Sequence, residues 1–250
     1  MGALGAYLSN HAIFIAAAVL CIPALIALNE IRPKEIDYIR ARNATQRDHT
    51  LDLQRLIDFM KNWRLVFFAG ALVLFHLCNA SLLPLVSENL AHSKVANSTL
   101  FMAGLIVVPQ LVVAILAPWI GYWSELWGRK PLLLVAFAIE AGRALLFAFV
   151  SDPVLMLVVQ VLDRVTGAAV TVLTILVTTD LTTGTGRFNL AQGVLGTIRG
   201  IAAAIGTGSV GFIVQHFGDF TGFLLMAIGP AAAALIWAFL RETKPEKYID

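Results

Sequence analysis

Residues 153–178 contain the densest set of chemically active side chains in a run otherwise made of Val, Leu, Ile and Ala. At 100° per residue, the polar and small members of this run share one stripe about 100° wide. They are Gln160, Asp163, Arg164, Gly167, Thr171, Thr174 and Thr178. The stripe predicts a helix that faces a water-filled cavity. The alternative is packing on another helix through small residues and threonine hydroxyls.

Glu140 and Arg143 lie in a second apolar run, and Arg143 is predicted at the same depth as Asp163. The two residues stand eight and ten positions from opposite ends of the turn "SDP". At 1.5 Å per residue both then lie near the middle of a membrane. Adjacent antiparallel helices could pair Arg143 with Asp163, while Glu140, three residues before Arg143, offers a partner on the same helix. This set is a candidate buried charge network, with a purely structural role as the alternative.

Three further polar residues, His76, Asn79 and Arg199, lie inside apolar runs. Ionisable side chains within a membrane are costly and are functional candidates by default. His76 could relay protons, although a hydrogen-bonded packing role is the alternative. We list them with Gln160, Asp163, Arg164, Thr171 and Thr174 as candidates for the lining of a polar intramembrane cavity.

The charges of these candidates suggest which solute the cavity would favour. Glu140, Arg143, Asp163, Arg164 and Arg199 sum to +1. The expected partner is a small solute of anionic or polar character.

The elements that position these residues follow from composition. The chain has 250 residues, 58% hydrophobic and 14% charged, with a mean hydropathy of +0.80. Soluble domains are about a quarter charged, which excludes that class here. A membrane span needs about 20 apolar residues, and seven runs qualify. They are 11–29, 64–87, 99–121, 131–150, 153–178, 190–214 and 221–240. The sequence therefore predicts an all-α membrane protein with seven transmembrane helices, and the lipid bilayer as its first partner.

The basic residues predict the orientation of the chain. Of 18 Lys and Arg, 14 fall in loops predicted on one side of the membrane, and the loops on the opposite side hold only Lys94. Since basic loops resist translocation, the first side is predicted to be cytoplasmic. The N-terminus is then outside, the C-terminus inside, and the location is the cell membrane.

The stretch "APWIGYWSELWGRKPLLLVAF", residues 117–137, joins two apolar runs through a short charged turn on that cytoplasmic side. Gly121 and Gly128 could permit a sharp turn and a close helix approach. Glu125, Arg129 and Lys130 could hold or release neighbouring helix ends, as a conformational latch. A basic turn that merely obeys the positive-inside rule is the alternative.

The spacing Gly121-x-x-x-Glu125-x-x-Gly128-Arg129-Lys130 resembles the signature loop of the major facilitator superfamily, Gly-x-Leu-Ala/Ser-Asp-Arg-x-Gly-Arg-Arg/Lys. The chain departs from that pattern at Trp123, Glu125 and Leu126. "LVFFAGALVLFHLCNASLLPLV", the run from "VQVLDRVTG" to "FNLAQG", and "RETKPEKY" extend the resemblance to bacterial members over most of the chain.

The resemblance implies the end of a fifth helix, the sixth helix and the six-helix C-terminal bundle of that fold, with most of the N-terminal half absent. Domain boundaries follow from it. They are 1–29 for the last helix of the N-terminal half, 30–63 for a cytoplasmic linker ending in an amphipathic helix, 64–241 for the bundle and 242–250 for the tail. The implied function is secondary active transport of a small solute by alternating access, with the polar candidates named above along the transport pathway. A co-transported proton, held by Asp163 or another buried carboxylate, would supply the energy. The missing N-terminal half or a second copy is the implied protein partner.

Other classes fit the sequence less well. A truncated half, inert or active only as a homodimer, stays open. A retinal-type seven-helix receptor would need an intramembrane lysine, and no predicted span contains one. An enzyme would need converging nucleophiles, paired carboxylates or a metal cluster, and the sequence shows none. We therefore expect no enzymatic activity, no cofactor, no metal and no nucleic-acid partner.

Overall fold

The chain folds into α-helices in the computed structural model, which describes residues 10–30, 60–92, 99–150 and 152–245. Six helices run through these residues. They are α2 (Asn10–Glu30), α5 (Trp63–His92), α6 (Thr99–Trp127), α7 (Arg129–Phe149), α8 (Pro153–Thr182) and α9 (Phe188–Phe239). The all-helical prediction is confirmed. The amphipathic helix predicted at the end of the linker lies mostly outside the described residues.

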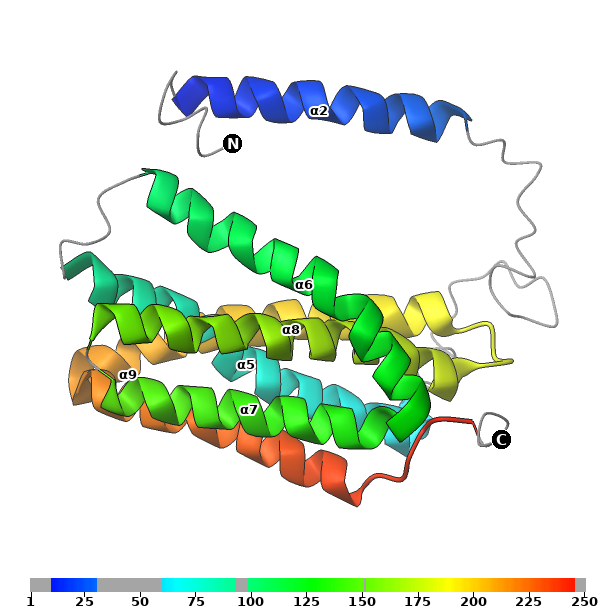
Figure 1. Cartoon of the computed structure of the whole chain (residues 1–250). Coiled ribbons are helices and arrows are strands. Elements are labelled where there is room, and N and C mark those ends of the chain that lie inside the picture. Colours follow the sequence, from blue (N-terminus) through cyan, green and yellow to red (C-terminus); the bar gives the residue numbers. More distant parts are fainter. Residues whose placement is uncertain (1–9, 31–59, 93–98, 151, 246–250) are drawn as a thin grey trace.

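The helix α9 consists of two helical segments joined at Gly218. A straight helix of 52 residues would be roughly 78 Å long, more than twice the thickness of a bilayer core. Gly218 has φ 81° and ψ 166°, a conformation that only glycine adopts easily. The chain reverses there, and 188–217 and 219–239 run back past each other, from yellow through orange to red in Figure 1.

Four helical stretches in the described part of the chain are long and apolar enough to cross a membrane. They are Trp63–Leu82, Arg129–Phe149, Val158–Thr182 and Phe188–Phe239. These match predicted spans, and the turn at Gly218 divides the last into the two that the sequence predicts. The total of seven spans stays a prediction.

The helices α5, α7, α8 and α9 form a bundle in which α9 packs on both α5 and α7, and α7 packs on α8. The helix α6 joins this bundle through α8, and α2 is drawn apart from it (Figure 1). The apolar side chains Ile15 and Leu25 of α2 are accordingly exposed. An apolar helix of this kind is suited to contact lipid or another protein.

The core of the bundle has two apolar clusters. One includes Phe68, Phe137 and Trp237 and lies toward the end of the bundle where α5 and α7 begin. The other includes Phe147 and Phe223 and lies toward the end where α7 finishes. The residues that separate the clusters along α5, α7 and α8 are polar, and they form the candidate site.

Candidate functional site

Glu140 and Arg143 form the centre of a buried polar layer between the two apolar clusters. Their side chains have no exposed surface, and Arg143 Nη2 donates a hydrogen bond of 2.5 Å to Glu140 Oε1. The spacing of three residues places both on one face of α7. The same-helix pair proposed from the sequence is therefore present.

Asp163 of α8 and Asn79 of α5 complete the layer. Arg143 Nη1 lies 3.0 Å from Asp163 Oδ1, so the pairing predicted across α7 and α8 is also present. The amide of Asn79 donates to Glu140 Oε1 at 3.1 Å and to Asp163 Oδ1 at 2.9 Å. One guanidinium and one amide thus hold two carboxylates from different helices.

Two residues complete the hydrogen bonding of this layer. The hydroxyl of Thr166 donates to Glu140 Oε2 at 2.9 Å, and Arg143 Nη1 makes a longer contact of 3.4 Å to Gln160 Oε1. Thr166 was missed from the sequence because it lies off the polar stripe of α8. Its position three residues after Asp163 was the available signal.

The layer joins the buried interior to a more accessible side through Arg164. Its Nε lies 3.1 Å from Asp163 Oδ2 in an ion pair without hydrogen-bond alignment, and its side chain is 25% exposed. Two carboxylates then face two guanidinium groups, and the net charge is zero. Buried charges persist only when paired and hydrogen-bonded in this way.

The polar stripe of α8 lies at the border between interior and surface. Gln160, Asp163, Thr174 and Thr178 are buried, whereas Thr171 is exposed. The hydroxyls of Thr174 and Thr178 donate to backbone carbonyls four residues earlier, at 2.6 Å each. Their hydroxyl groups therefore bond to the backbone of their own helix, as threonines in apolar helices commonly do.

His76 of α5 and Arg199 of α9 are polar residues outside the Arg143 layer. Arg199 lies close enough to His76 to act on it electrostatically. Arg199 Nε donates to the backbone oxygen of Leu195 at 3.2 Å, and His76 Nε2 is buried without a hydrogen-bond partner among the described residues. Since His76 and Asn79 are three residues apart, α5 links this pair to the polar layer.

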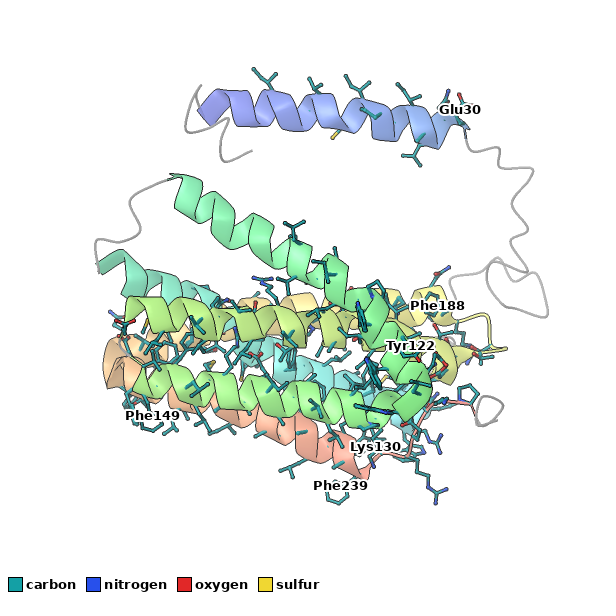
Figure 2. All side chains as sticks on the ribbon, viewed as in Figure 1. Glu30, Tyr122, Lys130, Phe149, Phe188 and Phe239 are labelled. Carbon is teal, nitrogen blue, oxygen red and sulfur yellow. The ribbon has the colours of Figure 1, made fainter. Side chains whose placement is uncertain are left out.

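The second group of candidates, around Arg129, lies at the end of the bundle where α6 finishes and α7 begins. Figure 2 labels Lys130 and Phe239 at this end and Phe149 at the other. Arg129 is only 4% exposed and donates in three directions. The acceptors are Asp180 Oδ2 at 3.1 Å, Glu125 Oε1 at 2.7 Å and the backbone oxygen of Ser124 at 2.8 Å.

The start of α7 is capped by Glu242, which the sequence analysis did not identify. Its carboxylate oxygens accept from the backbone N–H groups of Arg129 at 2.9 Å and Lys130 at 3.0 Å. These N–H groups have no partner within the helix, and the helix dipole favours an anion there. The available signal was a negative charge shortly after the last helix. Nothing in the sequence indicated that this charge returns to α7, 113 residues earlier in the chain.

The two glycines of the loop differ. Gly128 has φ 93°, and an added Cβ would lie 2.4 Å from Glu242 Oε2, so this position requires glycine. Gly121 instead lies within α6, and among the described residues nothing comes within 4 Å of where its Cβ would be. The turn lies at Gly128, and a close helix approach at Gly121 is not found within the described residues.

Two lysine side chains complete the charged end of the bundle, which is the end that holds the contacts of Arg129. Lys130 Nζ donates to the backbone oxygen of Ala238 at 2.7 Å, and Lys244 Nζ donates to that of Glu125. Burial acts to raise the pKa of the Glu242 carboxyl. Backbone N–H donors from Lys244, Lys130, Arg129 and Thr243 outweigh burial and hold this pKa below its ordinary value. Glu242 is therefore a carboxylate at neutral pH.

Comparison with known proteins agrees with the helical architecture. Residues 65–249 match the Major Facilitator Superfamily. Two curated relatives are both named uncharacterized MFS-type transporters of Mycobacterium tuberculosis, one from strain CDC 1551 / Oshkosh and one from strain ATCC 25618 / H37Rv. Each is 34% identical over 236 residues, which is 93% of this chain and 56% of the relative.

The chain thus spans little more than half the length of the curated relatives that it matches. The comparison with solved structures found no significant match. The family match covers α5 to α9, which includes both the polar layer and the charged loop. On these grounds the chain is a multi-pass membrane protein that belongs to the major facilitator superfamily, a family of transporters rather than enzymes.

Proposed function

We propose that this chain is the C-terminal portion of a secondary active transporter that moves a small solute by alternating access. The observation that supports this most directly is the position of Asp163. Its carboxylate joins the buried Arg143 to the more accessible Arg164, between two apolar clusters. A charged group at such a border can exchange partners when the surrounding helices move.

A proton is the proposed coupling ion, with Asp163 as its carrier. Protonation would remove the negative charge that faces Arg143 and Arg164, and the net charge of the layer would change from zero to +1. Asn79 and Arg143 would then hold only Glu140 firmly. The contact between α8 and its neighbours would weaken, which links proton binding to helix movement.

The Arg129 contacts are proposed to act as the latch of this cycle. They bring together α6 through Glu125, α8 through Asp180 and the chain after α9 through Glu242. Charge-assisted hydrogen bonds of this kind are stable when formed and can be replaced by water when broken. One of two helix arrangements would be favoured while they persist.

Two further proposals concern the protein partner of this chain and the solute that it carries. The first segment of α9 exposes a stripe of small residues, Gly193, Thr197, Gly200 and Ala204. Small-residue stripes let membrane helices approach closely. The proposed occupant is the N-terminal half of the carrier. A second copy of this chain is the alternative, in which a half-carrier acts as a homodimer. The net charge of +1 over the intramembrane set favours an anionic or polar solute.

The proposed location is a bacterial inner membrane, with the charged end of the bundle in the cytoplasm and the N-terminus outside. This is tested by replacing Cys21 and Cys78 and then introducing Glu125→Cys or Asp219→Cys. A membrane-impermeant maleimide applied to intact cells should label Asp219→Cys only. Labelling of Glu125→Cys alone would reverse the orientation.

Transport is tested with the carrier reconstituted in lipid vesicles, loaded with a pH-sensitive dye and exposed to panels of organic acids, phosphate and neutral solutes. A transported solute should move protons with it. Asp163→Asn should abolish proton movement while leaving solute exchange across equal concentrations. Asp219→Asn, in the exposed turn, is the matched control. Solute uptake that survives complete collapse of the proton gradient would refute the proton coupling.

A further inference from the structure

Among the described intramembrane residues, one guanidinium group has no carboxylate to balance its charge. Glu140 and Asp163 are neutralised by Arg143 and Arg164. Arg199, the remaining cation of the set, contacts no carboxylate in the described part of the chain, and its Nε bonds only the backbone oxygen of Leu195. A cation at this depth is unfavourable unless an anion or water meets it. Within the described residues, Arg199 therefore lacks a carboxylate partner.

Buried nitrogen atoms without partners lie near it. Among the described residues, Gln192 Nε2 and His76 Nε2 are both buried and make no hydrogen bond. Gln192 and Arg199 are seven residues apart, which places them on one face of α9. His76 belongs to α5, which packs along α9, and it lies within electrostatic range of Arg199. Unpaired buried polar atoms of this kind are costly and call for an explanation.

Open space lies between the two α9 side chains. Gly196 stands four residues after Gln192 and three before Arg199, on the same face, and it is only half-buried. Among the described residues, nothing lies within 4 Å of the position that a Cβ on Gly196 would occupy. Arginine side chains on helices lean toward the helix N-terminus, and the bond from Nε to the Leu195 oxygen fixes Arg199 in that direction. Its side chain is therefore directed along α9 toward the helix N-terminus, the part of α9 that carries Gly196 and Gln192.

We propose that Arg199, Gln192 and His76 form a binding site for the oxyanion group of the solute, separate from the Arg143 layer. The inference rests on the proposed function, because the site is argued to hold the carried molecule. It assigns the charged group of that molecule to the α5–α9 side of the bundle.

The chemistry of the site favours a carboxylate or a phosphate. Since Nε of Arg199 is occupied by Leu195, the two terminal nitrogens are left to donate. They form a planar fork that matches two oxygens of one oxyanion. The amide of Gln192 adds a donor along the helix. Halide ions would use the charge but not the fork, and neutral amides would use neither.

The site is tested by thermal unfolding of the purified chain in detergent at constant pH and ionic strength. The probes are acetate, succinate and inorganic phosphate, with acetamide and succinamide as uncharged partners and chloride as the balancing salt. A probe at about ten times its Kd should raise the unfolding midpoint by roughly 3 °C. Stabilisation by phosphate alone assigns a phosphate ester, and stabilisation by acetate or succinate assigns a carboxylic acid.

Three variants test whether the stabilisation depends on Arg199. Arg199→Gln should remove it, Arg199→Lys should retain part of it because the charge persists without the fork, and Arg241→Gln, at an exposed position after the last helix, should leave it unchanged. Equal stabilisation in Arg199→Gln, equal stabilisation by the uncharged partners, or no stabilisation by any anion would each overturn the site. Solute transport without Arg199-dependent stabilisation would refute this site and leave the proposed function intact. Arg199-dependent stabilisation without transport would refute the proposed function and leave an anion-binding site that does not serve transport.

Discussion

Arg129 Nε donates a hydrogen bond of 3.1 Å to Asp180 Oδ2, across 51 residues of sequence. The bond joins the first residue of α7 to the last turn of α8, at the end of the bundle where α9 both begins and finishes. Both side chains are largely buried, with 4% and 8% exposed surface. Such a pair contributes more than an ion pair at a fully exposed position.

Asp180→Asn is expected to loosen this end of the bundle, because the variant keeps an acceptor but loses the charge that Arg129 meets. Ser124, whose side chain is completely buried, reports the change. In a chain without Cys21 and Cys78, maleimide labelling of Ser124→Cys should become about tenfold faster for a loss of about 1.4 kcal/mol. Asp219→Asn at the opposite end should not alter the rate, and an unchanged rate in Asp180→Asn would show that this pair does not hold the end closed.

Arg143→Met is expected to destabilise the bundle by about 3–5 kcal/mol, because Glu140 would be left as a buried carboxylate without a cation and Asp163 would keep only Arg164. Thermal unfolding in detergent measures the effect. The double variant Arg143→Met, Glu140→Gln should recover part of the loss, since one unpaired charge is removed with its partner. If the double variant were less stable than the single one, the two residues would not act as a pair.

Gly206→Ala should also be destabilising, by about 1–3 kcal/mol. A Cβ at Gly206 would lie 1.8 Å from the backbone oxygen of Leu77, which cannot move away as a side chain could. Gly208→Ala is the matched control, because nothing among the described residues lies within 4 Å of its Cβ position. The control should be neutral or slightly stabilising, since alanine favours a helix over glycine. Equal effects of the two variants would contradict the packing of α5 on α9.

Glu242 predicts a pH dependence of stability. Its pKa in the folded chain lies below the ordinary value, so its stabilising effect is complete above that ordinary value and is lost as the pH falls through the folded pKa. The free energy of unfolding should therefore be higher in the parent chain than in Glu242→Gln at neutral pH, and the difference should shrink toward zero in acid. A difference that grows on acidification would reverse the sign and exclude the cap as its cause.

The sequence was sufficient for those features that depend on local pattern. Apolar runs of membrane length predicted the helices, and helix depth alone predicted the pairing of Arg143 with Asp163. The charged turn between two apolar runs also placed Glu125, Arg129 and Lys130 together. These properties are set by the geometry of single helices or of one hairpin.

Contacts that depend on how several helices pack were not predictable in this way. Asn79 contacts both carboxylates because α5 crosses α7 and α8 at its level, and Thr166 reaches Glu140 from a face of α8 outside the polar stripe. The role of Asp180 required the ends of two helices to coincide. The close helix approach expected at Gly121 stays a prediction, since none of the described residues packs against that glycine.

The cap on α7 has a consequence for biosynthesis. Glu242 is translated 113 residues after Arg129, which at typical rates of chain elongation is a delay of about 6–23 s. During that interval the first N–H groups of α7 must be met by water or lipid headgroups. The charged end of the bundle therefore reaches its final form only after the ribosome has finished the last helix, and variants of the tail should act on maturation of the newly made protein as well as on its mature state.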